Sequence, residues 1–200
     1  METKGRNSRA MKVLEEGVER RVVIEAYARY DCSKKGSSPP DFAAWDWSVA
    51  DMIDSRMKES GLKVGVPAGY LLWDKVGVTL SDLRECAVVA NVFPGQPRKL
   101  GCIERSGGLV GWKPDRAAAW YREICSGKTF GAAAPMMFRP AVRGESPASW
   151  YVEDGSGRAI AFVANQIMFH PSQTLAIGYL GRQPDLGSPF MQKNFRELCT

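Results

Sequence analysis

The stretch WYVEDGSGRAIAFVANQIMF, residues 150–169, places a polar cluster between two apolar runs. Residues 149–155, SWYVEDG, are typical of a strand, and residues 156–169 predict a helix that is apolar on nearly every side. Such a helix is buried by its neighbours, so the backbone N–H groups of its first turn need partners. The stretch therefore predicts a strand-to-helix turn at the centre of an α/β fold.

An anion is one partner that this turn could take. The free N–H groups and the helix dipole both favour negative charge, and Gly155 and Gly157 let a phosphate approach the backbone closely. Arg158 has a planar fork of donors that can clamp a phosphate, and Ser156 adds a hydroxyl. The residue types at 155–158 thus fit an anion nest.

The two carboxylates before the turn leave two interpretations open. Glu153 and Asp154 could hold a magnesium ion that bridges the phosphates, or orient an attacking water. Alternatively, Asp154 or Ser156 caps the helix, Gly155 makes the turn and Arg158 pairs with Glu153 at the surface. Spacing does not separate an anion site from a structural turn.

The rest of the chain mixes predicted helices and strands with short connections. Strands are predicted at 22–30, 86–93, 134–142 and 174–181. Helices are predicted at 41–60, 81–85, 114–126 and 189–198. A short helix or extended lead-in is expected from residue 13, a loop at 33–41, an irregular hairpin at 100–112, and 62–86 is otherwise ambiguous. This order favours one α/β (α+β) domain with a mixed sheet flanked by helices, in which 1–85 packs as helices and a strand on an 86–200 core.

Composition sets the class of protein. The chain has 200 residues, of which 44% are hydrophobic and 24% charged, as in a globular protein. No apolar run approaches the roughly 20 residues of a membrane span, and the start lacks a signal peptide, so we expect a cytoplasmic protein without membrane insertion. Five scattered cysteines and one histidine do not fit a disulfide framework or a zinc site. The net charge of +5 permits nucleic acid or phosphate as a ligand.

Three other features have ordinary explanations. The GKT at 127–129 is not a P-loop, because Arg122 stands where that loop needs a glycine. His170 at the end of a helix is better explained as a C-terminal cap than as a general base. The six tryptophans are better explained as core and interface anchors than as platforms for stacked bases.

Three segments occur in an order that resembles a known superfamily. FPGQPRK at 93–99 resembles the N-P-x-Q-P-R box of ParB-type proteins, and APMMFRPAV at 134–142 resembles their P-I-x-V-R strand. EDGSGRAIA at 153–161 occupies the place of the G-x-x-R turn of ParB and sulfiredoxin. The resemblance covers roughly residues 88–170. Within it, the chain resembles most the plasmid fertility inhibition factors, a group that includes an oncogenic suppression protein, through WYVEDGSGRA and AIGYLGRQPD.

The resemblance implies a ParB/sulfiredoxin-like domain with ATPase and DNase activity that blocks export of transferred DNA through a type IV secretion system. It implies DNA and the secretion coupling ATPase as partners, and ATP or another nucleoside triphosphate with Mg²⁺ as cofactors. The implied catalytic residues are Glu153, Asp154 and Arg158, and the two carboxylates would also bind the metal. The implied nucleotide contacts are Gly155, Ser156, Gly157, Arg158, Arg98, Lys99 and Arg139.

Two departures narrow this expectation. Ser156 stands where sulfiredoxin has its reactive cysteine, which excludes sulfinic acid repair, and Gly157 replaces one arginine of the ParB turn. The short remainder after residue 170 leaves no room for the helix-turn-helix and dimerisation domains of a partition protein. Two alternatives stay open: a non-catalytic inhibitor that docks on the coupling ATPase, and a DNA-binding regulator, which the lack of a recognition-helix motif disfavours.

Overall fold

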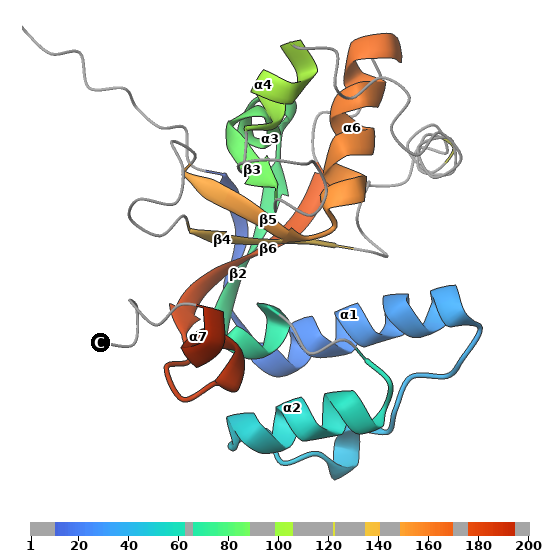
Figure 1. Ribbon diagram of the computed structural model, residues 1–200, viewed down its shortest axis with the longest axis vertical. Helices are drawn as coiled ribbons and strands as arrows, with labels where there is room; N and C mark the ends of the chain where they lie inside the picture. Colours follow the sequence, from blue (N-terminus) through green and yellow to red (C-terminus); the bar gives the residue numbers. More distant parts are fainter. Residues whose placement is uncertain are drawn as a thin grey trace, which may run out of the picture.

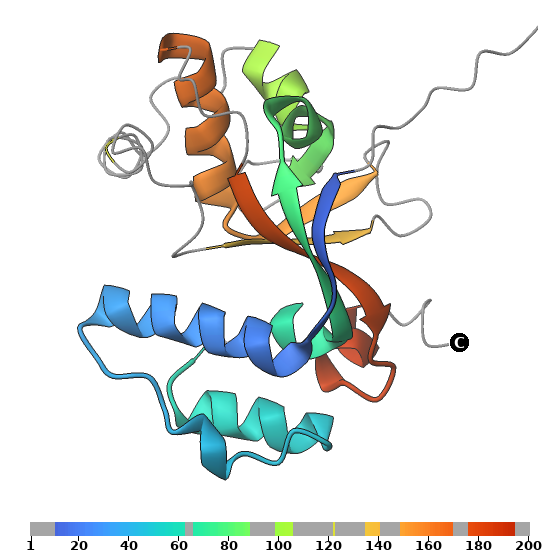
Figure 2. The same ribbon diagram turned by 180° about the vertical axis from the view of Figure 1, so that it is seen from behind.

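The computed structural model describes residues 11–62, 66–88, 99–105, 122, 135–140, 149–169 and 176–194. They form a six-stranded mixed sheet with helices on both faces (Figures 1 and 2). The predicted α+β class, a mixed sheet flanked by helices, is confirmed.

The strands come from both ends of the chain. Their order across the sheet is β1 (Lys12–Glu19), β2 (Tyr70–Val78), β6 (Ala176–Pro184), β4 (Met136–Pro140), β5 (Trp150–Asp154) and β3 (Cys86–Val88). β3 and β5 are parallel, as are β4 and β6, and the other neighbours are antiparallel. Because β2 pairs with β6, the first 85 residues share one sheet with the rest.

The two faces of the sheet carry different helices. In Figure 1, α3 (Leu80–Glu85), α4 (Leu100–Arg105) and α6 (Ser156–Phe169) lie above the sheet, and α1 (Arg20–Lys35) and α2 (Ala50–Glu59) lie below it. Alternation along β4 serves both cores, since Met136 and Phe138 pack with α6 whereas Met137 packs on the α1 side. α7 (Pro189–Asn194) and two 3₁₀ turns, η1 (Phe42–Ala44) and η2 (Val66–Gly69), belong to the lower layer.

The helix after the 153–155 turn has the bounds predicted for it. α6 spans Ser156–Phe169, and Ala159, Ile160, Phe162 and Val163 are almost wholly buried. They pack against the upper face of the sheet together with α3 and α4. The apolar pattern predicted this element because tertiary burial and helix spacing agree there.

The first helix corrects a strand prediction. Residues 22–30 were expected to form a strand from the run VVIEAYARY, but they lie inside α1, and the strand is β1 before them. Val23, Ile24, Tyr27 and Ala28 are buried, together with Cys32, at the spacing of a helix face. Burial of this face on the sheet overrides the β propensity of the three branched residues. The loop expected at 33–41 therefore begins only after Lys35, with Gly36 as the helix cap.

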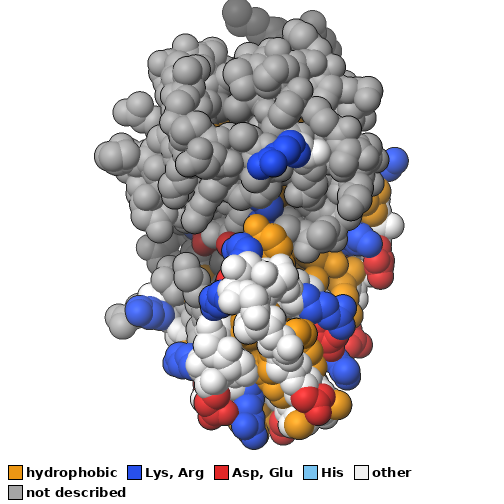
Figure 3. Space-filling view, turned by 90° about the vertical axis from the view of Figure 1, so that its right-hand side faces the viewer, with side chains coloured by type: hydrophobic (Ala, Val, Ile, Leu, Met, Phe, Trp, Pro, Cys, Tyr) orange, Lys and Arg blue, Asp and Glu red, His pale blue; other side chains and the backbone are white. Residues whose placement is uncertain are grey.

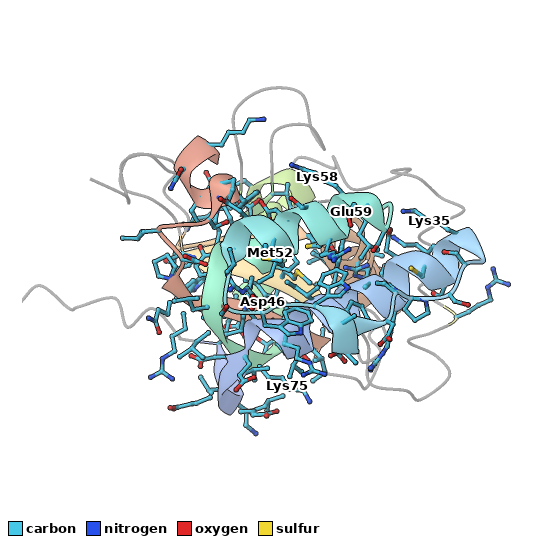
Figure 4. All side chains as sticks on the ribbon, turned by 90° about the horizontal axis from the view of Figure 1, so that it is seen from below. Lys35, Asp46, Met52, Lys58, Glu59 and Lys75 are labelled. Carbon is cyan, nitrogen blue, oxygen red and sulfur yellow. The ribbon has the colours of Figure 1, made fainter. Side chains whose placement is uncertain are left out.

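The next segment is also less helical than predicted. The helix expected over 41–60 is divided into η1, which Asp41 caps through the Ala43 N–H, and α2, which starts only at Ala50. Figure 4 views the molecule from below, where α2 carries Met52, Lys58 and Glu59. In the ambiguous region that follows, β2 was not predicted, whereas α3 was, and a Thr79–Asp82 capping box begins it.

The hairpin predicted at 100–112 is wrong in its described part. Residues 100–105 form α4, with Leu100 fully buried, and this helix contacts α3 and α6. The turn glycines that suggested a hairpin, Gly107 and Gly108, lie outside the described residues.

The remaining predicted elements are present wherever they fall within the described residues. β4, β5, β6 and α7 are confirmed, and β3 covers the first three residues of the strand predicted at 86–93. The helix predicted at 114–126 lies outside the described residues except for Arg122. Within the described ranges, no helix combines the length and the apolar composition that crossing a membrane requires.

Candidate functional site

The turn between β5 and α6 is tight and depends on glycine. Gly155 has a φ of 84°, in the left-handed region that side chains disfavour. A Cβ at this position would lie 2.7 Å from Arg158 Nη2 and 3.0 Å from Arg158 Nε, so the guanidinium is folded directly over the turn. The Ala159 N–H donates to the Gly155 carbonyl at 2.9 Å and starts the helix. The first turn of α6 and the arginine head thus converge on one point.

Arg158 is buried and only partly satisfied. Its side chain is 5% exposed, and Nη2 donates to Asp154 Oδ2 at 2.9 Å and to the Pro135 carbonyl at 3.1 Å. Its Nε, also buried, has no hydrogen-bond partner among the described residues. A buried guanidinium that keeps an unsatisfied donor is costly, so Nε is the donor near the turn that would gain most from an acceptor.

Glu153 belongs to a second ion pair. Arg139 of β4 donates from Nε to Glu153 Oε1, and from Nη1 to the Pro140 carbonyl at 3.0 Å. The arginine is 4% exposed, and its Cζ lies 4.2 Å from the centroid of the Tyr151 ring. Arg139 therefore binds protein groups in this conformation, and a phosphate would reach it only by displacing them.

The two carboxylates have different partners. Glu153 pairs with Arg139 and Asp154 pairs with Arg158, and the register between β4 and β5 shifts at this point, because Met137 is opposite Asp154 whereas Phe138 is opposite Val152. Arg158 was expected to pair with Glu153 if the turn were only structural, so that detail is corrected. Over the described part of the chain, no three His, Cys, Asp or Glu side chains are grouped as metal ligands. Magnesium binding by Glu153 and Asp154 stays a prediction, and in this conformation each carboxylate is engaged by an arginine.

The other sequence-predicted residues are less central. The Ser156 hydroxyl turns back to the Val152 carbonyl at 3.3 Å and is buried, and Gly157 lies in the first turn of α6. Lys99 forms an isolated antiparallel β-bridge with Ala87 of β3, and its side chain forms an ion pair with Glu85. Arg98 lies outside the described residues.

One face of α1 lies close to the turn between β5 and α6. The sequence did not predict this contact. Arg158 Cζ lies 4.6 Å from the centroid of the Tyr30 ring, and Lys34 Nζ lies 4.2 Å from the same centroid. Burial raises the pKa of Tyr27, and the charges of Asp154 and Asp31 raise it further, against the opposing effect of Arg158. Tyr27, Tyr30, Asp31 and Lys34 have the spacing of one helix face. This pattern was missed because a strand was predicted there.

Charge on the surface is mixed on the side that Figure 3 shows. There, over the part of the chain that is described, Lys and Arg side chains are interspersed with Asp and Glu side chains. Nucleic acid binding usually uses a basic band or patch. The described part of this face therefore offers no electrostatic signature of a DNA track.

Comparisons of the chain with protein-family models, with curated proteins and with solved structures give no match. The chemistry of the site therefore rests on its own geometry. That geometry comprises a helix N-terminus, a buried arginine whose Nε has no partner among the described residues, and a carboxylate that already neutralises the arginine.

Proposed function

We propose that this chain is a plasmid fertility inhibition protein of ParB/sulfiredoxin type. In this proposal it binds a nucleoside triphosphate at the Gly155–Arg158 turn, hydrolyses it and cleaves DNA, and thereby blocks export of transferred DNA through a type IV secretion system. The family and its activities come from the ordered resemblance of three segments, and the α+β fold is compatible with them.

One observation carries the binding step. The Arg158 guanidinium lies over Gly155 at the N-terminus of α6, buried and with Nε lacking a described partner. A phosphate oxygen would accept from Nε and from the first N–H groups of the helix, where the dipole favours an anion. Asp154 now holds Nη2 of the same arginine, so the phosphate replaces or joins this carboxylate.

The proposed catalytic roles follow from this placement. Arg158 would stabilise charge on the transferred phosphate, as guanidinium groups do in phosphoryl transfer. Glu153 is held by Arg139 and is 11% exposed, whereas Asp154 is 39% exposed and is the more accessible of the two carboxylates for orienting water. No step is assigned to magnesium, because both carboxylates are paired with arginines in this conformation.

Hydrolysis and nicking assays test the enzymatic proposal. Wild type, Arg158→Ala, Asp154→Ala and Glu153→Ala are compared for ATP hydrolysis and plasmid nicking, with and without Mg²⁺, after circular dichroism has shown that each is folded. Arg29→Ala is the matched control, because Arg29 is 66% exposed and contacts Glu25 on α1. Loss in Arg158→Ala with retention in the control is expected. Equal activity in all folded variants, or no activity in any, contradicts the proposal.

The second candidate is a non-catalytic inhibitor that docks on the coupling ATPase. It is favoured by a specific observation: both carboxylates of the turn are already paired with arginines. In that case the turn only holds β5 and α6 together. This candidate predicts that a folded Arg158→Ala variant still binds the purified coupling ATPase as wild type does, and that neither wild type nor variant hydrolyses ATP by itself.

A further inference from the structure

The α1 face that meets the turn comes from the other side of the sheet. α6 lies above the sheet and α1 below it (Figures 1 and 2), yet Tyr30 of α1 and Arg158 of α6 are in contact. Tyr27, one turn earlier on the same face, has a pKa that burial raises, with further contributions from the charges of Asp154 and Arg158 beside it. The contact therefore joins the two layers at the end of β5, where α6 begins.

The Tyr30 ring restricts where the arginine head can lie. Arg158 has two described hydrogen-bond partners, and both engage Nη2, while Nε has none. Hydrogen bonds to one nitrogen fix that end of the guanidinium but restrain the tilt of its plane less. The ring at 4.6 Å from Cζ supplies the second restraint, since an aromatic face attracts a guanidinium.

The same ring carries a second cation. Lys34 Nζ lies 4.2 Å from the Tyr30 centroid, and its carboxylate neighbour, Asp31 Oδ1, is 3.8 Å away, whereas Lys35 contacts Asp31 at 2.6 Å. Lys34 is thus the less committed of the two lysines and is 53% exposed. Two cations on one ring repel each other, and an anion close to both would relieve this repulsion.

We propose that Tyr30 is a positioning residue of the phosphate site: its ring holds the Arg158 guanidinium over the N-terminus of α6. This inference rests on the proposed function for its ligand. It gives the N-terminal segment a role in the site, because α1 supplies the wall against which the arginine is held.

Binding and spectroscopy together test the inference. ATP and inorganic phosphate are titrated into wild type, Tyr30→Phe and Tyr30→Leu, with thermal unfolding measured for each. Tyr30→Phe keeps the ring and should bind as wild type does, whereas Tyr30→Leu should weaken binding roughly threefold to thirtyfold, the effect of losing a cation–π contact.

The NMR signals of the Arg158 side chain make the inference independent of ligand binding. In wild type and Tyr30→Phe, the ring should shift the Arg158 Hδ and Hε resonances upfield, and in Tyr30→Leu this shift should vanish. Unshifted resonances in wild type would overturn the positioning role, even if Tyr30→Leu does not fold. Binding by a stable Tyr30→Leu variant as tight as wild type would overturn it as well. If wild type binds neither ATP nor phosphate, the proposed function fails, and the resonances still decide whether Tyr30 positions Arg158.

Discussion

Gly155 is the residue on which the turn geometry depends most directly. Its φ of 84° is strained for any side chain, and a Cβ would collide with the Arg158 head. We expect Gly155→Ala to lower the free energy of unfolding by about 2–4 kcal/mol, from backbone strain and the clash together. Denaturant unfolding measures this change.

Gly36 provides the matched control for that variant. It has a φ of 67° at the end of α1, and no atom lies within 4 Å of the place that a Cβ would occupy. Gly36→Ala should therefore cost only the backbone term, about 1–2 kcal/mol. An equal loss in both variants would contradict the close approach of Arg158 to the turn.

Asp54 shows how a buried residue can make stability depend on pH. It is 3% exposed on α2, its Oδ1 has no hydrogen-bond partner among the described residues, and burial raises its pKa above the ordinary 3.8. Asp51 and Asp185 raise this pKa further, against Lys58 and Arg20. The folded state therefore keeps the proton to a higher pH than the unfolded chain does.

The sign of the Asp54 effect follows from this raised pKa. Its contribution to stability is fully present below the unfolded pKa and is lost as the pH rises through the folded pKa. Asp54→Asn removes the charge, so we expect it to stabilise the protein by about 1 kcal/mol at pH 7, or about 2–4 °C in Tm, and not at about pH 3.5. Thermal unfolding at both values checks this, and a variant less stable than wild type at pH 7 would contradict it.

Among the helices and strands, the sequence was most informative where local pattern and burial agree. α6 was predicted with its observed bounds, and β4 and β5 were predicted before it, because the sequence of each has the pattern of a buried element. α1 was missed because Val22, Val23 and Ile24 favour a strand locally, whereas packing of Tyr27 and Cys32 on the sheet decides for a helix.

The contrast between local sequence pattern and tertiary packing also explains which parts of the site could be predicted. The cluster at 153–158 was found from sequence because its residue types lie next to each other in the chain. The pairing of Arg139 with Glu153 depends on the register between β4 and β5, and the pairing of Arg158 with Asp154 depends on how the turn at Gly155 places the start of α6. Tyr30 could not be found, because its contact with Arg158 depends on how α1 packs beneath the sheet edge.

Across the molecule as a whole, Arg20 ties the lower layer to the end of the sheet. Its Nη1 contacts Asp185 Oδ2 at 2.5 Å and the Ala68 carbonyl at 3.4 Å, and Nη2 donates to the Trp47 carbonyl at 3.1 Å. The side chain is 6% exposed. One guanidinium therefore joins α1, the segment before α2, η2 and the loop after β6.

Removing this junction should destabilise the fold. Arg20→Met keeps much of the volume but removes the arginine donors from Asp185 Oδ2 and from two carbonyls, so we expect a loss of about 3–5 kcal/mol. Arg29→Met on the same helix should change stability by less than about 0.5 kcal/mol, because Arg29 is exposed and its ion pair among the described residues is with Glu25 of α1. Urea unfolding of both variants decides, and a similar loss in both would rule out the proposed junction.

The proposed function depends above all on a nucleotide phosphate binding at the N-terminus of α6 beside Arg158. A titration of ATP into isotope-labelled wild-type protein examines this step, followed through the backbone amide resonances of residues 155–158 and the Arg158 Nε–H. We predict that these resonances shift first and saturably, and that Arg158→Gln removes the shifts while leaving the rest of the spectrum folded. Shifts confined to other residues, or an unchanged spectrum at millimolar ATP, would contradict this binding site.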